Sequence, residues 1–284
     1  SSLSRRFLQA SSPPETSVPA MAESAPKKQK TEETPAEEAP TADETMKEAA
    51  VEEAPAPEPE LEQDAPADKG AKLKEPVAFN TEDTTMNVMP SSVGSILMPL
   101  TDGGLQYLLA GVRANVGVKS GRYIFEVKVL EAMNPADDPA ARQRTPMPRN
   151  QLRIGFSTAG SSLFLGDDAD GICFDTEGAL MHDKSKTATK ASFGAGCVVA
   201  VLLNLDKTSP NANTISLFVN GERACAPQAL PDALKGKTLC PAMTFKNMTL
   251  HYNFGPTPLT PLPFTCRMVG DAAAKDVQVV AATT

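Results

Sequence analysis

Histidine and cysteine, which most metal sites and many catalytic sites require, are scarce in this chain. Only two of its 284 residues are histidine, His182 and His251, and neither stands in an HxH or HxxxH spacing. No CxxC, GxSxG or HExxH motif and no Cys–His pairing occurs either. These absences argue against a zinc site and against the common hydrolase motifs, so we expect no enzyme, no metal and no cofactor.

The cysteines are odd in number and widely spaced, which argues against a disulfide framework. Two of them, in GICFD and at the start of an apolar run, have the pattern of small core residues. We therefore expect reduced, structural thiols in an intracellular protein. The five residues are Cys173, Cys197, Cys225, Cys240 and Cys266.

Long apolar runs are also missing. Residues 197–203 form one of the longest and have the length of a strand, whereas a spanning helix needs about 20 residues. The opening SLSRRFLQASS faintly resembles a transit peptide but has no apolar segment of a secretory signal. The MAESAPKKQK context at Met21 favours a natural start there. We expect no membrane partner.

Acidic charge lies at one end of the chain. Residues 21–75 hold sixteen Asp and Glu against seven Lys and Arg, whereas residues 76–284 hold eighteen of each. Residues 1–75 have almost no aromatic or β-branched apolar side chains, so burial cannot offset the entropy of ordering them. We predict a disordered, acidic, Pro/Glu/Ala-rich tail over 1–75, acting as a spacer or attracting basic partners.

Period-two alternation dominates the rest of the chain. Residues 123–131 form the clearest strand pattern, in which the apolar Tyr123, Phe125, Val127 and Val129 are expected to face a core. Residues 198–205 are apolar throughout, which is typical of a strand buried on both faces. No helix-period segment interrupts the series. The pattern predicts an all-β antiparallel sandwich over 76–270, followed by a tail over 271–284.

Shorter signals complete this prediction. Asn220-Gly221 indicates a tight type I′ hairpin turn. Gly155, inside a strand pattern, indicates a bulge or a close approach of another backbone. Residues 105–109, LQYLL, are expected to form one of the early strands.

Six motifs, in order, resemble those of the SPRY domain family and cover residues 77–270. They are SGRYIFEVKV (120–129), LRIGFS (152–157), LGDDADGICFD (165–175), the apolar run into NLD (198–206), ISLFVNGE (215–222) and HYNFG (251–255). The resemblance implies a concanavalin-like jelly roll of two sheets that serves protein interaction.

Within that family, residues 108–121 and 253–264 are especially similar to heterogeneous nuclear ribonucleoprotein U and its U-like relatives. This similarity implies a nuclear, RNA-associated protein. RNA binding is thus the alternative function and the nucleus the expected location, with the cytoplasm as the alternative. Those relatives carry a P-loop domain after the SPRY domain, but the only GKT here, at residues 236–238, has Pro231 where a Walker A motif needs Gly. The KKQK patch at 27–30 is a minimal import signal.

A protein partner is expected to bind loops at one end of the sandwich, and the chain is expected to be a monomer. The loops are 132–150, 158–170, 183–196 and 206–213. Arg113 has two interpretations, an open interface residue between glycines or an anchor for loop carbonyls. The candidate partner-binding residues are Arg113, Asn115, Arg142, Arg144, Arg149, Asp167, Asp168, Lys184 and Lys186.

Two further hypotheses concern charged side chains. Asp167 and Asp168 lack the spacing of a calcium loop, which favours a role in capping turns. Glu126 and Arg153 stand at polar-face positions of strong strands. They are expected either to form a cross-strand ion pair or to line the floor of a binding face.

Overall fold

The structure, a computed structural model, describes residues 60–65, 70–92, 94–133, 148–189 and 191–280. All of them belong to one of the two units into which the chain divides, Ala56–Thr284. The prediction for residues 1–59, including the lysine patch, lies outside the described residues.

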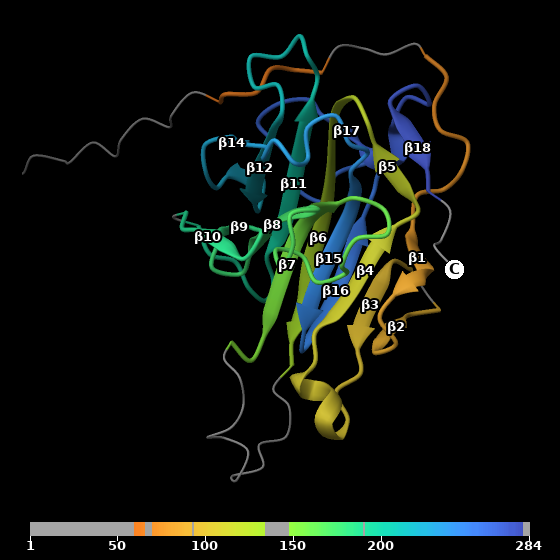
Figure 1. The fold of residues 1–284 in the computed structure, drawn as a ribbon, viewed down its shortest axis with the longest axis vertical. Coiled ribbons are helices and arrows are strands. Elements are labelled where there is room, and N and C mark those ends of the chain that lie inside the picture. Colours follow the sequence, from red (N-terminus) through yellow and green to blue (C-terminus); the bar gives the residue numbers. More distant parts are fainter. Residues whose placement is uncertain (1–59, 66–69, 93, 134–147, 190, 281–284) are drawn as a thin grey trace, which may run out of the picture. The chain divides into compact units, whose positions relative to one another are not determined.

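Two sheets stacked face to face make up the described domain (Figure 1). The first sheet has seven strands, all antiparallel to their neighbours. In spatial order they are β1 (Phe79–Thr84), β4 (Ala110–Ala114), β15 (Cys240–Lys246), β7 (Gln151–Ser157), β8 (Gly171–Asp175), β9 (Leu180–His182) and β10 (Ser185–Thr187).

The second sheet has nine strands. Its main order is β13 (Glu222–Arg223), β12 (Thr214–Val219), β11 (Val198–Leu205), β6 (Gly121–Ala132), β16 (Met248–Asn253), β3 (Ile96–Pro99) and β2 (Val88–Pro90). β14 (Gln228–Ala229) pairs with β12, and β17 (Arg267–Met268) pairs with β6 in parallel. The predicted all-β antiparallel sandwich is confirmed, with β17 as the parallel exception.

A small third sheet and two 3-10 turns lie at the ends of the domain. β18 (Val277–Val279) pairs with β5 (Val116–Val118), and η2 (Val269–Asp271) directly follows β17. η1 (Gly103–Tyr107) is the yellow coil at the opposite end from β17 and β18 in Figure 1.

The core lies between the two large sheets and follows the predicted alternation. Tyr123, Phe125, Val127 and Val129 of β6 are all buried against the first sheet. The rings of Phe125 and Phe156 meet edge to face with their centroids 5.3 Å apart, which joins β6 to β7.

Single residues of these strands also behave as predicted. β11 is buried along its whole length. A Cβ at Gly155 would lie 2.1 Å from the Ile172 carbonyl oxygen, which confirms the close approach of β8. Asn220 and Gly221 both have positive φ, as a type I′ turn requires.

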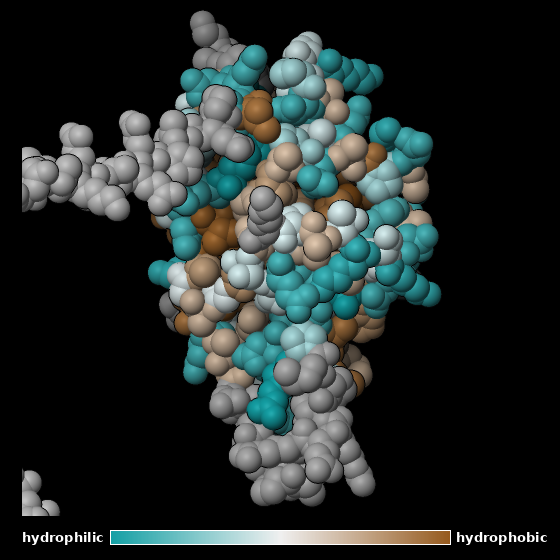
Figure 2. Space-filling model, turned by 90° about the vertical axis from the view of Figure 1, so that its left-hand side faces the viewer, coloured by the Kyte–Doolittle hydropathy of each residue, from teal (hydrophilic) through white to brown (hydrophobic). Residues whose placement is uncertain are grey.

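The outer face of β6 is also covered, which the alternation did not indicate. Ile124 packs with Ala200, Leu202 and Phe218 beneath two buried residues of the C-terminal segment, Phe264 and Met268. This segment therefore belongs to the fold. Figure 2 shows a face on which hydrophilic residues predominate and hydrophobic ones form small separate groups, as is usual for a protein surface.

Three predicted bounds need correction. Residues 105–109 are not a strand, because Gly103, at φ +57°, opens a tight turn in which the Leu105 amide bonds the Asp102 carbonyl. Ordered structure extends past residue 270, since β18 lies at 277–279. It also begins before residue 76, because residues 60–65 make ion pairs and hydrogen bonds to the second sheet.

Candidate interaction surfaces

Arg113 is a structural residue and not the sterically open one that its glycine neighbours suggested. Its side chain is 0% exposed and pairs with Asp83 at 3.0 Å. The guanidinium also donates to the Ser157 hydroxyl and to the carbonyls of Ser161 and Ser162. The loop-anchoring interpretation is therefore the correct one, and Arg113 fixes residues 158–170 against β4 and β7.

The side chains of Asn115 and Asp168 likewise form hydrogen bonds to backbone groups of the same domain. Asn115 accepts a hydrogen bond from the Ala78 amide and donates one to the Pro76 carbonyl. Asp168 accepts bonds from the Ser162 and Asp170 amides, which is the predicted turn capping.

Of the remaining candidates, Lys184 lies beside Asp167 and Asp168, because the Lys184 amide bonds the Gly166 carbonyl and the Asp183 amide bonds the Asp168 carbonyl. Asp167 is exposed and pairs with Arg153, and Lys184 is exposed in the turn between β9 and β10. The carboxylates of Asp175 and Glu177 accept bonds from Lys186 and raise its pKa. Arg149 is half-buried, and its carbonyl accepts a bond from Asn247. Arg142 and Arg144 lie outside the described residues.

The predicted loops do not share one end of the sandwich. β6 and β11 run antiparallel, with Gly121 beside Leu205 and Lys128 beside Val198. The 132–150 connection therefore leaves β6 at one end, while the 206–213 loop leaves β11 at the other. A partner cannot use all four loops through one end.

The expected pair of Glu126 and Arg153 does not form, because the two residues lie in different sheets. Glu126 is buried in β6 and accepts bonds from Asn253 and the Leu259 amide. Arg153 donates to the Leu165 carbonyl and to Asp167. Burial raises the pKa of Glu126, although these hydrogen bonds act in the opposite direction.

An exposed apolar groove lies beside η1. Three of its side chains are large and open to solvent, namely Met86 at 98%, Leu108 at 52% and Phe164 at 36% exposure. The groove encloses about 450 Å³. We call it the apolar groove; it is lined by Thr85, Met86, Asn87, Leu100, Leu105, Leu108, Leu109 and Phe164.

The walls of the apolar groove are held in place by hydrogen bonds. The Thr85 hydroxyl donates to Asn87, whose amide donates to the Leu109 carbonyl. On the other wall, the Thr244 hydroxyl donates to the Leu163 carbonyl and accepts from the Leu165 amide, on either side of Phe164. A Cβ at Gly111 would lie 2.5 Å from the Leu163 oxygen, so only glycine lets this loop approach β4 so closely. The groove is therefore preformed.

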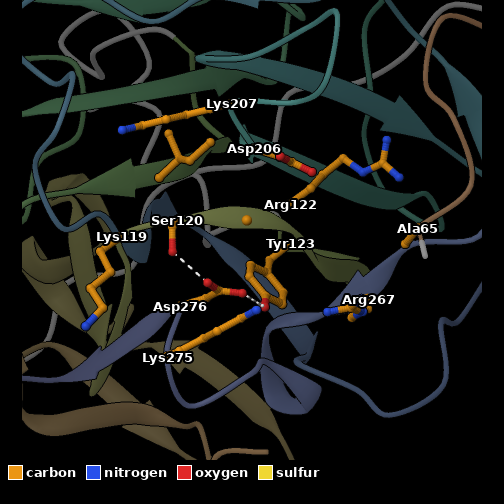
Figure 3. Close-up of a pocket in the computed structure, with 12 residues that line it drawn as sticks. Ala65, Lys119, Ser120, Arg122, Tyr123, Asp206, Lys207, Arg267, Lys275 and Asp276 are labelled. Carbon is orange, nitrogen blue, oxygen red and sulfur yellow. Dashed lines mark hydrogen bonds between the residues drawn. The ribbon is translucent and has the colours of Figure 1, made fainter. Parts of the chain in front are cut away.

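A second concave surface, the basic cleft, lies at the start of β6 and the end of β11. It encloses about 580 Å³. Figure 3 shows Asp276 between Ser120 and Tyr123, with the basic side chains around them. The Ser120 and Tyr123 hydroxyls donate to Asp276 at 2.6 and 2.8 Å. The charged residues of its lining are Lys119, Arg122, Asp206, Lys207, Arg267, Lys275 and Asp276.

Two residues of the cleft lining have shifted pKa values. Burial and the hydrogen bond to Asp276 raise the pKa of Tyr123 to about 12, so its hydroxyl stays protonated. Hydrogen bonds from the Thr208 hydroxyl and amide lower the pKa of Asp206. The lining of the cleft thus contains five basic and two acidic side chains.

The described residues contain no group of three or more His, Cys, Asp or Glu side chains placed to hold a metal ion. His182 lies in β9 with its Nδ1 3.0 Å from the Gly171 carbonyl oxygen. Among the described residues, no helix has the length and apolar character to cross a membrane.

Sequence reasoning missed both concave surfaces. The groove residues come from four segments, near positions 86, 100, 108 and 164, which only the fold brings together. The one local signal was the apolar character of residues 105–109, which was assigned to a strand.

Part of the chain is similar to two curated RNA helicases. It is 28% identical over 148 residues to the ATP-dependent RNA helicase Ddx1 of Drosophila melanogaster and 24% identical over 145 residues to the ATP-dependent RNA helicase DDX1 of Xenopus laevis. The matches cover 52% and 51% of this chain but only 17% of each helicase. The similarity therefore concerns one segment of those proteins.

No family model matches the chain. Among solved structures, the chain is similar to the SPRY domain of human HERC1, with a TM-score of 0.44 and 20% sequence identity. That similarity covers 62% of this chain and 96% of the HERC1 domain.

Proposed function

We propose that this chain is a protein-interaction module of the SPRY type, which binds a partner protein in its apolar groove. The order of the six sequence motifs and the two-sheet sandwich support the domain type. The observation that carries the interaction is the exposure of Met86, Leu108 and Phe164 around one hollow.

Exposed apolar side chains that converge on one groove favour burial by another molecule. Burying a Leu, Met or Phe side chain fully is worth about 1.5–3 kcal/mol each. Most of the other large apolar residues of the domain are already buried in its clusters. Because the groove is concave and nearly free of charge, an apolar side chain of the partner would fill it.

The groove needs little ordering before it binds. Phe164 sits between two residues whose backbone is fixed to Thr244, and Arg153 also donates to the Leu165 carbonyl at 2.7 Å. A preformed site loses less conformational entropy on association. We therefore expect Phe164 to act as a rigid anchor of the interface.

We also propose the kind of assembly in which the chain acts. Two segments of the sequence resemble heterogeneous nuclear ribonucleoprotein U, and about half of the chain is similar to the two RNA helicases. Both similarities support a place in a nuclear, RNA-associated assembly. In this proposal the chain contributes protein contacts, and RNA binding by the chain itself is the alternative function.

The test compares capture by matched variants. Immobilised full-length chain, its Leu108→Ser/Phe164→Ser variant and a Val279→Ser control are incubated with the same cell extract. Val279 is 44% exposed in β18, away from the groove, so it controls for loss of surface apolar area. We expect at least one protein retained by the wild type and by the control and lost from the groove variant. Identical retention by all three would contradict the proposed site.

A further inference from the structure

Residues 60–65, with the sequence ELEQDA, form an acidic strap on the second sheet. The strap holds its carboxylates at alternate positions. Glu60 and Glu62 pair with Arg223 and Arg122, and Asp64 accepts a 2.6 Å bond from the Thr265 amide. Glu62 is buried, Glu60 is half-buried, and Leu61, Gln63 and Asp64 are exposed. Leu61 and Glu62 lie in a bend, and their amides donate to the Glu60 carboxylate. The surface therefore contacts a turned segment, mainly through its acidic side chains.

The surface under the strap is built to receive carboxylates. The guanidinium of Arg223 lies over the Phe218 ring at 4.7 Å, and that of Arg122 lies 5.8 Å from the Phe264 ring. Stacking on aromatic rings orients these groups for charge-assisted hydrogen bonds.

Amide side chains complete the site around Glu62, whose side chain is fully buried. Asn204 donates to one oxygen of Glu62 at 3.1 Å, and Asn211 donates to the other at 3.3 Å. Asn211 also donates to the Leu61 carbonyl at 2.7 Å. These contacts recognise a carboxylate and the backbone carbonyl beside it, and none depends on the side chains of Leu61 or Gln63.

The basic cleft continues the line of the strap. Ala65, the last residue of the strap, forms part of the cleft wall, and its amide bonds the Thr265 carbonyl at 2.7 Å. Beyond it, Lys119, Lys207 and Lys275 are exposed on the cleft rim. An acidic segment that followed the same path would therefore meet further cations.

We propose that the surface under the strap and the adjoining basic cleft form a binding site for short acidic peptide segments. The strap occupies this site as an internal ligand, and an acidic segment of a partner replaces it. The site lies apart from the apolar groove and does not depend on the function proposed for that groove.

The composition of the cleft favours a peptide over RNA. Its one aromatic residue, Tyr123, is buried and offers no face on which a base could stack. Arg122, by contrast, already binds a carboxylate.

Competition with the strap sets the expected affinity. A tethered ligand has an effective concentration near the millimolar range when its linker is short. A free peptide therefore binds the wild type only in the fraction of molecules whose site is open. Weakening the strap should raise the apparent affinity of the free peptide.

The experiment measures binding of a fluorescent ELEQDA peptide to the full chain by anisotropy. The amide peptide QLQQNA is the control ligand. We expect the Glu60→Gln/Glu62→Gln/Asp64→Asn chain to bind the acidic peptide at least tenfold more tightly than the wild type, and the amide peptide not to bind. Adding Arg122→Gln should weaken binding at least tenfold. Adding Lys128→Gln, which removes the same charge further along β6, should not.

Three results would overturn the proposal. These are equal binding of both peptides, no effect of Arg122→Gln, or binding of a uridine oligonucleotide but not of the acidic peptide. If the strap variant fails to fold, hydrogen exchange on the wild type decides the question. Excess acidic peptide should then accelerate exchange of the Ala65 amide, and an unchanged rate would reject displacement of the strap.

Discussion

Arg113 joins four segments through one guanidinium. Asp83 neutralises its charge, Ser157 holds Nε, and Ser161 and Ser162 accept from Nη2. Removing one member of such a buried ion network lowers the free energy of unfolding strongly, because the remaining charged and polar groups are left buried without partners. Since the segment it anchors carries Phe164, this residue also positions one wall of the apolar groove.

We predict that Arg113→Ala lowers the free energy of unfolding by about 3–5 kcal/mol. Urea denaturation followed by circular dichroism measures the change. Lys184→Ala, at an exposed position, is the control and should change stability by less than about 0.5 kcal/mol. An Arg113 variant as stable as the control would show that the buried network contributes little.

Glu126 should make stability fall as pH rises. Burial raises its pKa in the folded chain above its ordinary value of 4.5. Between these two values the folded state binds more protons than the unfolded state. The stability that protonated Glu126 contributes is therefore fully present below its ordinary pKa. It is lost as the pH rises through the pKa of Glu126 in the folded chain.

We predict that Glu126→Gln removes the loss of stability that ionisation of Glu126 causes as the pH rises, because glutamine does not ionise. The free energy of unfolding, measured between pH 4 and pH 7, should decline less steeply with rising pH in the variant. The difference between the two curves isolates Glu126 from the other carboxyls. Parallel curves would contradict the raised pKa.

At the scale of elements, the C-terminal segment acts as a cover for the second sheet. Phe264 and Met268 pack on Ile124, Ala200 and Phe218, and β17 pairs with β6 beside them. This cover explains why β6 and β11 bury both of their faces in their central residues.

We predict that Phe264→Ala destabilises the chain by about 3 kcal/mol, because it opens a cavity over Phe218 and removes the ring beside Arg122. Leu259→Ala, at an exposed position of the same segment, should cost far less. Thermal unfolding of both variants checks the comparison. Equal effects would mean that the segment does not cover a second core.

The sequence predicted those strands whose inner face can be identified from the local alternation of apolar side chains. Alternation at Tyr123–Val129 reveals a strand and its inner face, because both depend on period two. The burial of Ile124 depends on Phe264, which lies 140 positions later, and no local pattern carries that information. Arg113 was ambiguous for the same reason, since Asp83 and Ser161 are distant in the sequence.

For the whole molecule, the ordered domain includes part of the acidic region. Glu62 is buried against Arg122 and Asn204, and Lys72 bonds Asp271. Composition indicated disorder through residue 75, because charge and proline content say nothing about a complementary surface elsewhere in the chain. The described structure at 60–65 and 70–75 therefore belongs to the sandwich.

We predict that a fragment of residues 56–284 is more stable than one of residues 76–284 by at least about 2 kcal/mol. The shorter fragment leaves Arg122 and Asn204 without the carboxylate that satisfies them. Urea denaturation of the two fragments measures the difference. Equal midpoints and slopes would show that the strap does not contribute to the fold.

Photo-crosslinking from the apolar groove tests the central claim most directly. A benzophenone amino acid is placed at Leu108 or, as a control, at Val279, and the full chain is irradiated in cell extract. The proposed function predicts one partner protein crosslinked from position 108, absent from position 279 and suppressed by Phe164→Ser. No adduct at position 108, or the same adducts from both positions, would contradict it.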